Sequence, residues 1–232
     1  MSGASARLSG PPARSMRRIG VFGGSFNPIH HGHLLLADEI LERLGLDRML
    51  FVPAAMPPHK SSRDLAPAID RYRMVQLAIA RHPGFVVSDV ELSRPGVSYT
   101  VDTLTELAVS GDELFLVIGS ETFLDLLSWR EPRQVARLAR LVVVPRAGSP
   151  FDPESAAAQK VLREIGIDRF DIVDRPPLPT GSVLVVHATS LPISASDLRR
   201  RIREGRPVES RIPEAVIDYV SAHALYQGDA AA

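Results

Sequence analysis

The sequence predicts an α/β fold built on a parallel sheet, with helices on both faces of the sheet and a small helical part at the C-terminal end. Two observations support this prediction. Short apolar runs alternate along the chain with segments of helical periodicity, which is the order expected of consecutive βα units. The apolar runs are continuous rather than interleaved with polar residues, as is typical of strands that are buried on both faces.

The expected strands are short apolar runs, several of which stop directly at Gly or Pro, residues that end regular structure. The first run stops at Gly23-Gly24, which suits a buried strand that leads into a tight turn. The expected strands are 18–22, 49–52, 85–88, 114–118, 141–144 and 183–186.

The expected helices carry apolar residues three and four positions apart. In 33–44 this pattern is followed by Gly45, a plausible C-terminal cap. Segment 53–67 is rich in proline and is expected to be a loop, and 147–181 is the segment most suited to leave the sheet. The expected helices are 33–44, 70–81, 101–109, 153–165, 196–203 and 213–224. Strand order does not follow from these patterns, but a ligand is expected at the carboxyl ends of the strands.

The composition limits the classes of protein to which the chain can belong. Its 232 residues suit one domain, which we expect over 18–226, with disordered tails at 1–17 and 227–232. The 27 basic and 27 acidic residues give no net charge, which argues against a nucleic-acid partner. Cysteine is absent, so thiolate chemistry and disulfides are excluded.

No stretch approaches the ~18 apolar residues of a membrane span, and 1–17 lacks the apolar core of a signal peptide. We therefore expect no membrane partner and a cytoplasmic protein.

The most informative stretch is 23–33, GGSFNPIHHGH, in which a strand leads through paired glycines into a helix start. Glycines let the backbone approach a bulky anion, and the amides of a helix N-terminus bind phosphate. His30 and His33 add hydrogen-bond donors at the mouth of the helix. Paired glycines or a capping histidine are common when each stands alone, but their joint occurrence favours a phosphate site. The stretch is neither a Walker A loop nor a Gly-x-Gly-x-x-Gly fingerprint.

A second candidate element is 193–199, ISASDLR, near the other end of the chain. The hydroxyls of Ser194 and Ser196 precede a helix that carries Arg199, so they offer donors and a fixed cation at a helix start. Taken alone, the element is better interpreted as an ordinary helix N-cap followed by a basic helix face exposed to solvent. Its pairing with 23–33 favours a second half of the same anion site.

These two elements resemble the signature of the nucleotidylyltransferase superfamily, with its His-x-Gly-His tetrad at 30–33 and its Ile-Ser-Ser/Thr-x-x-x-Arg element at 193–199. Position 195 is Ala here, a mild departure. The resemblance implies a Rossmann-like fold, transfer of a nucleotidyl group from ATP or CTP, and catalytic roles for His30, His33 and Arg199. The ATP contacts that it implies are Gly23, Gly24, Ser25, Phe26, His30, Gly32, His33, Gly119, Arg146, Ile193, Ser194, Ser196 and Arg199.

Between these elements the chain resembles the bacterial nicotinate-nucleotide adenylyltransferases in particular. The first matching segments are a loop that ends in Pro-Pro-His-Lys at 52–60, an Arg-x-x-Met helix start at 71–74 and a Ser-Tyr-Thr-x-Asp-Thr-Leu segment at 98–104. A Gly-Ser-Glu stretch followed by the single Trp matches at 119–130, and a terminal Ile-Pro-Glu-Ala-Val helix matches at 212–220. The resemblance extends over about 18–226. It implies a catalytic role for Lys60 as a mobile phosphate cation. The nicotinate-nucleotide contacts that it implies are Asn27, Lys60, Tyr99, Thr100, Thr103, Glu121 and Trp129; Asn27 and Glu121 stand where family members usually carry Asp.

The implied reaction transfers the adenylyl group of ATP to nicotinate mononucleotide and gives deamido-NAD and pyrophosphate. Mg²⁺ is expected to bind with ATP, held by phosphate oxygens and water, and we assign no protein metal ligand. The alternatives are a related enzyme that uses nicotinamide mononucleotide, phosphopantetheine or, with CTP, glycerol phosphate, and a nucleotide-binding regulator without activity. The sequence gives no indication of oligomeric state.

Overall fold

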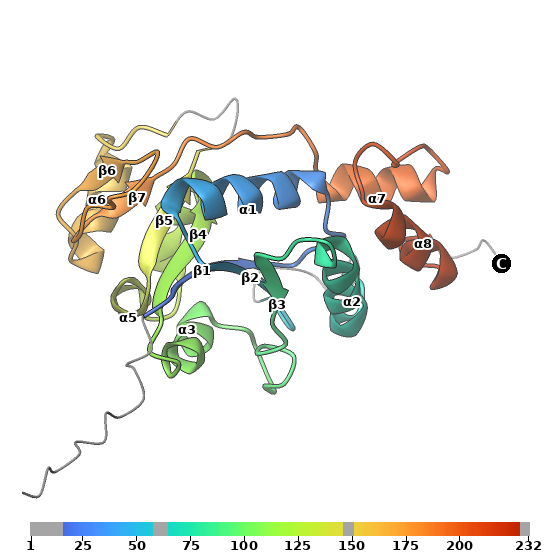
Figure 1. Ribbon diagram of the computed structural model, residues 1–232, viewed down its shortest axis with the longest axis horizontal. Coiled ribbons are helices and arrows are strands. Elements are labelled where there is room, and N and C mark those ends of the chain that lie inside the picture. Colours follow the sequence, from blue (N-terminus) through green and yellow to red (C-terminus); the bar gives the residue numbers. More distant parts are fainter. Residues whose placement is uncertain (1–15, 58–64, 146–150, 228–232) are drawn as a thin grey trace, which may run out of the picture.

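The computed structural model describes residues 16–57, 65–145 and 151–227. They form an α/β fold around one seven-stranded sheet in the order β3-β2-β1-β4-β5-β7-β6, and every pair of neighbouring strands is parallel (Figure 1). The strands are β1 (Arg18–Gly24), β2 (Arg48–Pro53), β3 (Phe85–Val87), β4 (Glu113–Gly119), β5 (Arg140–Val144), β6 (Phe170–Ile172) and β7 (Val183–Val185). The predicted Rossmann-like fold class is confirmed.

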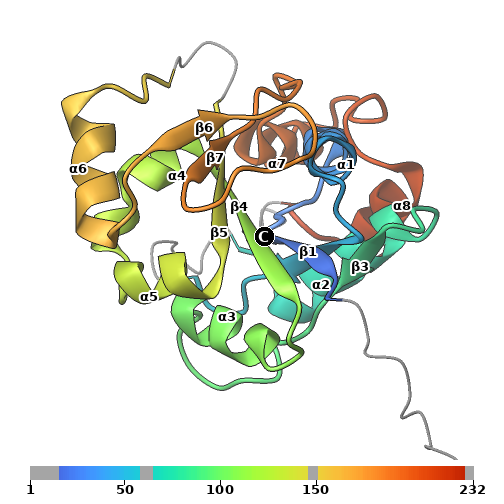
Figure 2. The same ribbon diagram turned by 60° about the vertical axis from the view of Figure 1, so that its left-hand side comes forward.

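Helices cover both faces of this sheet. In Figure 1, α1 lies above the sheet and α3 and α5 lie below it, while α7 and α8 form the small C-terminal part beside α2. Figure 2 shows α6 at the side of the molecule opposite α8. The helices are α1 (His31–Leu44), α2 (Ala68–Ile79), α3 (Thr100–Ala108), α4 (Ser120–Leu124), the 3₁₀ turn η2 (Leu126–Ser128), α5 (Pro132–Leu138), α6 (Ala156–Ile165), α7 (Ala195–Arg203) and α8 (Glu214–Ala222).

Two hydrophobic cores explain why the strands read as continuous apolar runs. In β4, Phe115 and Val117 belong to the same core as side chains of α1 and α2, while Leu114 and Leu116 belong to the other core, with side chains of α3 and α6. Successive strand residues point to opposite faces of a sheet, so a strand covered by helices on both sides needs apolar residues at every position. The same alternation occurs in β1 and β5.

The strand order contains a switch point between β1 and β4. The chain runs from β1 outward to β2 and β3, and then returns to place β4 on the other side of β1. The loops that follow β1 and β4 therefore turn away from each other and leave a crevice at the carboxyl ends of these strands, the usual ligand position in such sheets.

Two features differ from the expectations drawn from the sequence. Segment 147–181 does not simply leave the sheet, because it contains β6, which pairs with β7 at the sheet edge. The segment between β4 and β5 contains α4, η2 and α5, which were not predicted. Arg17, which lies in the predicted tail, forms an ion pair with Asp112 at 2.6 Å. The domain boundaries stay a prediction.

The longest described helix, α1, has 14 residues, and no helix of the described chain has the length and apolar character needed to cross a membrane.

Candidate active site

A cleft with a volume of about 1000 Å³ opens at the carboxyl ends of β1 and β4. Residues from both ends of the sequence meet around it, as the two sequence elements predicted. The predicted site residues that line the cleft are Gly23, Gly24, Ser25, Phe26, Asn27, Gly32, His30, His33, Tyr99, Thr100, Thr103, Gly119, Trp129, Ile193 and Ser194.

The other predicted site residues lie elsewhere. Ser196 lies next to the cleft, with its hydroxyl oxygen 2.7 Å from that of Ser194. Arg199 lies behind the loop that lines the cleft, and Glu121 is exposed on α4 outside the lining. Lys60 and Arg146 fall outside the described residues. The roles assigned to these residues stay predictions.

Two glycines beside the loop that joins β1 to α1, Gly24 at the end of β1 and Gly32 in the first turn of α1, lie against aromatic rings. A side chain at Gly24 would place its Cβ 3.2 Å from the ring of Phe26, whose backbone has a left-handed φ of 44°. A Cβ at Gly32 would lie 3.1 Å from the ring of His30. Such contacts are tighter than side chains usually tolerate, so both glycines make room for the rings that shape the cleft floor.

The two histidines of the tetrad form one stacked unit at the start of α1. Their ring centroids lie 3.7 Å apart with an interplanar angle of 21°. The backbone N–H of His30 donates to Nδ1 of His33 at 3.3 Å. Because this bond uses the lone pair of Nδ1, the neutral ring of His33 carries its proton on Nε2, where it is a hydrogen-bond donor. Phe26 packs edge-on against His33 at 5.2 Å and fixes the ring plane.

His30 is 6% exposed, and its burial, with a smaller effect of neighbouring His31, lowers its pKa to about 4. The imidazole is therefore neutral at pH 7. A neutral ring still donates one hydrogen bond, so His30 can contact a phosphate without a fixed positive charge.

This burial predicts a pH-dependent loss of stability. The unfolded chain binds a proton at His30 near pH 6.5 but the folded chain only near pH 4, so stability falls as the pH drops between these values. We expect about 2 kcal/mol of this loss between pH 7 and pH 5. Urea unfolding of the wild type and of His30→Gln at both pH values measures it. The stability difference between the two proteins should change by that amount, and an unchanged difference would contradict the assignment.

A fully buried arginine holds the loops around the cleft. The guanidinium of Arg71 on α2 donates to three backbone carbonyls, those of Ser25 at 2.9 Å, Ala55 at 3.1 Å and Ala66 at 2.8 Å. These carbonyls belong to the loop after β1 and to the chain between β2 and α2. Arg71 therefore ties the loop between β1 and α1 to the chain between β2 and α2.

Asn27 is buried at the centre of a second set of bonds. Its Oδ1 accepts from the hydroxyl of Tyr226 at 2.7 Å and from the amide of Ala66 at 3.0 Å. Its backbone carbonyl accepts from Nη1 of Arg199 at 2.9 Å. Arg199 and Tyr226, from the C-terminal part of the chain, thus hold the loop between β1 and α1.

A backbone contact strengthens the same attachment at the start of α1. The amide of His31 donates to the carbonyl of Arg211 at 2.9 Å. This amide belongs to the first turn of the helix, where no carbonyl of the helix itself can accept from it. The segment before α8 therefore supplies the missing acceptor.

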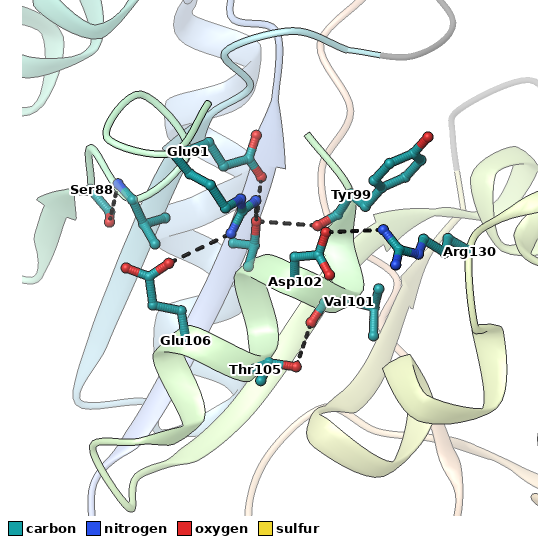
Figure 3. Close-up of polar contacts among 11 residues, drawn as sticks. Ser88, Glu91, Tyr99, Val101, Asp102, Thr105, Glu106 and Arg130 are labelled. Atoms are coloured by element: carbon teal, nitrogen blue, oxygen red, sulfur yellow. Dashed lines mark hydrogen bonds and ion pairs between the residues drawn. The ribbon is translucent and has the colours of Figure 1, made fainter. Parts of the chain in front are cut away.

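The other half of the cleft is formed by the first turn of α3 and the turn after η2 (Figure 3). Thr103 is buried, and its hydroxyl lies 2.8 Å from Oε1 of Glu91 and 3.0 Å from Nη2 of Arg94. Arg130 reaches from the turn after η2 toward α3 and lies over the ring of Tyr99 at 5.1 Å.

Several residues that line the cleft were not predicted, among them Glu91, Ser98, Thr122, Arg130, Thr189 and Ser190. Ser98 belongs to a segment that the sequence did single out, and its hydroxyl accepts from the amides of Ala55 and Met56. Thr122 and Arg130 lie in segment 119–130, which was also singled out, although no role was assigned to either residue. Glu91, Thr189 and Ser190 lie in segments without a local pattern that marks a site.

Comparison with known proteins shows the family of the chain. A model of the cytidylyltransferase-like family matches residues 21–201. The chain is 41% identical over 214 residues to a probable nicotinate-nucleotide adenylyltransferase of Thermomicrobium roseum, covering 91% of this chain and 92% of that protein. A protein with the same name from Thermus thermophilus is 43% identical over 212 residues, covering 90% of this chain and 100% of that protein.

The chain belongs to the nicotinate-nucleotide adenylyltransferase family.

Solved structures show the same fold at lower identity. Two structures of the Plasmodium falciparum nicotinic acid mononucleotide adenylyltransferase, one complexed with APC and one with NaAD, match with TM-scores of 0.67 and 0.69. They are 19% and 20% identical to this chain, and each match covers 90% of this chain and 97% of the other. This member of the nicotinate-nucleotide adenylyltransferase family therefore has the same fold as an enzyme that has been solved in complex with NaAD.

Proposed function

We propose that this chain transfers the adenylyl group of ATP to nicotinate mononucleotide, giving deamido-NAD and pyrophosphate. The observation that carries the proposal is the meeting of two anion-binding elements at one cleft. His30, Gly32 and His33 come from the start of α1, and Ser194 comes from the start of α7, yet all four line the same cavity. The names and high identity of the relatives support nicotinate mononucleotide as the acceptor.

The proposed reaction is a direct displacement at phosphorus. An oxygen of the acceptor 5′-phosphate forms a bond to the α-phosphorus of ATP, and the bond from that phosphorus to the oxygen that bridges to the β-phosphate breaks. The electron pair leaves with pyrophosphate. The attacking phosphate is an anion at neutral pH, so no side chain has to remove a proton. The work of the protein is to position the two substrates and to stabilise the negative charge of the transition state.

Each half of the cleft has its own task in this proposal. The amides at the start of α1 and the ring N–H groups of His30 and His33 bind the triphosphate. Ser194 approaches it from α7, and Arg199 acts behind the loop through the carbonyl of Asn27. The half that contains Tyr99, Thr103 and Trp129 binds the acceptor, with aromatic rings beside a flat pyridine ring.

The side chains that line the cleft are compatible with a Mg²⁺ ion that is held by the substrate rather than by the protein. No group of three His, Cys, Asp or Glu residues that could hold a metal lies in the described part of the chain, and Glu91 is the one carboxylate among the described lining residues. We propose that Mg²⁺ enters with ATP, bound to phosphate oxygens and water, and neutralises phosphate charge there. We also propose that the reaction takes place in the cytoplasm.

Pyrophosphate release tests the proposal. We would supply Mg-ATP with nicotinate mononucleotide, nicotinamide mononucleotide or phosphopantetheine and compare kcat/KM. We expect nicotinate mononucleotide to be preferred by at least about tenfold, which corresponds to about 1.4 kcal/mol. Preference for another acceptor would assign a different enzyme of the same superfamily, and no release with any acceptor would favour a nucleotide-binding regulator.

A further inference from the structure

The cleft binds anionic substrates in the proposed function, yet its described lining contains few charged side chains. Of the residues that the structure describes there, Arg130 is the one Arg or Lys, and Glu91 is the one Asp or Glu. Both lie around the first turn of α3, in the half of the cleft that we assign to the acceptor (Figure 3). The charge of Arg130 is therefore well placed to distinguish between acceptors.

Arg130 is held so that its guanidinium stays beside the aromatic walls of the cleft. It follows Trp129 directly and lies 5.1 Å from the ring centre of Tyr99, a distance typical of a cation–π contact. Its Nη1 lies 3.5 Å from Asp102 and its Nε 3.6 Å from Glu131. Figure 3 shows the side chain extended toward Asp102 with Tyr99 beside it. Within the described chain, the third nitrogen, Nη2, has no hydrogen-bonding partner.

The ion pairs of Arg130 leave it able to bind a ligand. Its side chain is 51% exposed, and those of Asp102 and Glu131 are 37% and 58% exposed. Exposed pairs of this length contribute little free energy, so a ligand carboxylate can compete with both acids for the guanidinium. Glu91, by contrast, is 8% exposed and already accepts from Thr103, so it presents negative charge to any anion in this half of the cleft.

Nicotinate and nicotinamide mononucleotides differ only in the group on the pyridine ring, a carboxylate in one and a neutral amide in the other. A guanidinium fork binds a carboxylate through two parallel N–H donors, but it gains much less from an amide. Resting on the proposed function, we propose that Arg130 is a specificity-determining residue that binds the pyridine carboxylate and favours nicotinate over nicotinamide mononucleotide.

The test compares both acceptors in Arg130→Gln and in wild type. We expect the ratio of kcat/KM for nicotinate mononucleotide to that for nicotinamide mononucleotide to fall by about tenfold, the typical effect of one charge-assisted hydrogen bond. Arg130→Lys keeps the charge without the fork and should give an intermediate ratio. Arg133→Gln is the matched control, since Arg133 lies on α5 outside the cleft and pairs with Glu164 at 3.8 Å. Its ratio should equal that of the wild type.

The outcomes separate this inference from the function on which it rests. A wild type that prefers nicotinate mononucleotide, with an unchanged ratio in Arg130→Gln, would overturn the role of Arg130 and leave the proposed function intact. A wild type inactive with nicotinate mononucleotide would overturn both. If Arg130→Gln unfolds, Arg130→Lys decides the question. An Arg130→Lys protein with the wild-type Tm and the wild-type ratio of kcat/KM for the two acceptors would overturn recognition of the carboxylate by the guanidinium.

Discussion

Replacing His33 by Ala is expected to lower kcat for adenylyl transfer by about 10²-fold or more, the typical cost of one preorganised donor at a developing negative charge. His33 lines the cleft, and the amide of His30 bonds to its Nδ1 so that Nε2 carries the proton. Alanine removes this donor and also leaves the stacked ring of His30 without its neighbour. Steady-state rates of pyrophosphate release with saturating Mg-ATP and nicotinate mononucleotide measure the effect.

His31→Ala provides a matched control for this experiment. His31 occupies the same turn of α1 but does not line the cleft, and its backbone amide still donates to Arg211 after the substitution. We expect its kcat to stay within about threefold of the wild type, as for a side chain away from the reacting groups. A folded His33→Ala protein with near-normal kcat would remove His33 from the mechanism.

Replacing Arg71 by Met is expected to lower the free energy of unfolding by about 4 kcal/mol. The side chain is fully buried, and its guanidinium donates to three backbone carbonyls. Methionine fills much of the volume but cannot donate these three hydrogen bonds, and a hydrogen bond from a charged group contributes about 1.5–3 kcal/mol. Urea unfolding followed by circular dichroism measures the loss.

Arg73→Met, two residues along the same helix, separates this effect from the loss of a charge. Arg73 is exposed and bonds only to Gln76 within the described chain. We expect its stability to change by less than about 0.5 kcal/mol, as is usual for exposed positions. Equal losses in Arg71→Met and Arg73→Met would show that the three carbonyl bonds do not stabilise the fold.

Much of the fold could be predicted because its strands and long helices leave local patterns in the sequence. Continuous apolar runs marked β1, β2, β4 and β5, and Gly45 marked the end of α1, where it adopts a left-handed φ of 59°. The short helices α4 and α5 span too few turns to produce a clear helical period. Strand β6 lies at the edge of the sheet and has the sequence Phe-Asp-Ile, with a polar residue at its centre. Its Ile172 is 68% exposed, so the segment lacks the continuous apolar run of an inner strand.

The candidate site was predictable where its residues lie close together in the chain. The loop 23–33 places glycines, a helix start and two histidines within a short stretch, and the cleft is lined by them. Contacts between distant segments left no such signal. Arg71 was noted only as part of a family motif, and its hydrogen bonds to backbone carbonyls require nothing of the side chains at those positions. The contact of Arg130 with Tyr99 depends on the packing of the turn after η2 against α3, which no local pattern encodes.

The bond between Tyr226 and Asn27 joins positions 199 residues apart, which has a consequence for biosynthesis. A ribosome makes Asn27 early and Tyr226 almost 200 residues later, so the growing chain has the loop between β1 and α1 long before it has the hydroxyl that holds it. Arg199, which holds the carbonyl of the same residue, is also made late. The βα units can fold in the order of synthesis. The candidate site, in contrast, is completed only when Arg199 and Tyr226 have left the ribosome and packed against the loop, so a nascent chain should gain its proposed affinity for ATP only after Tyr226 has emerged.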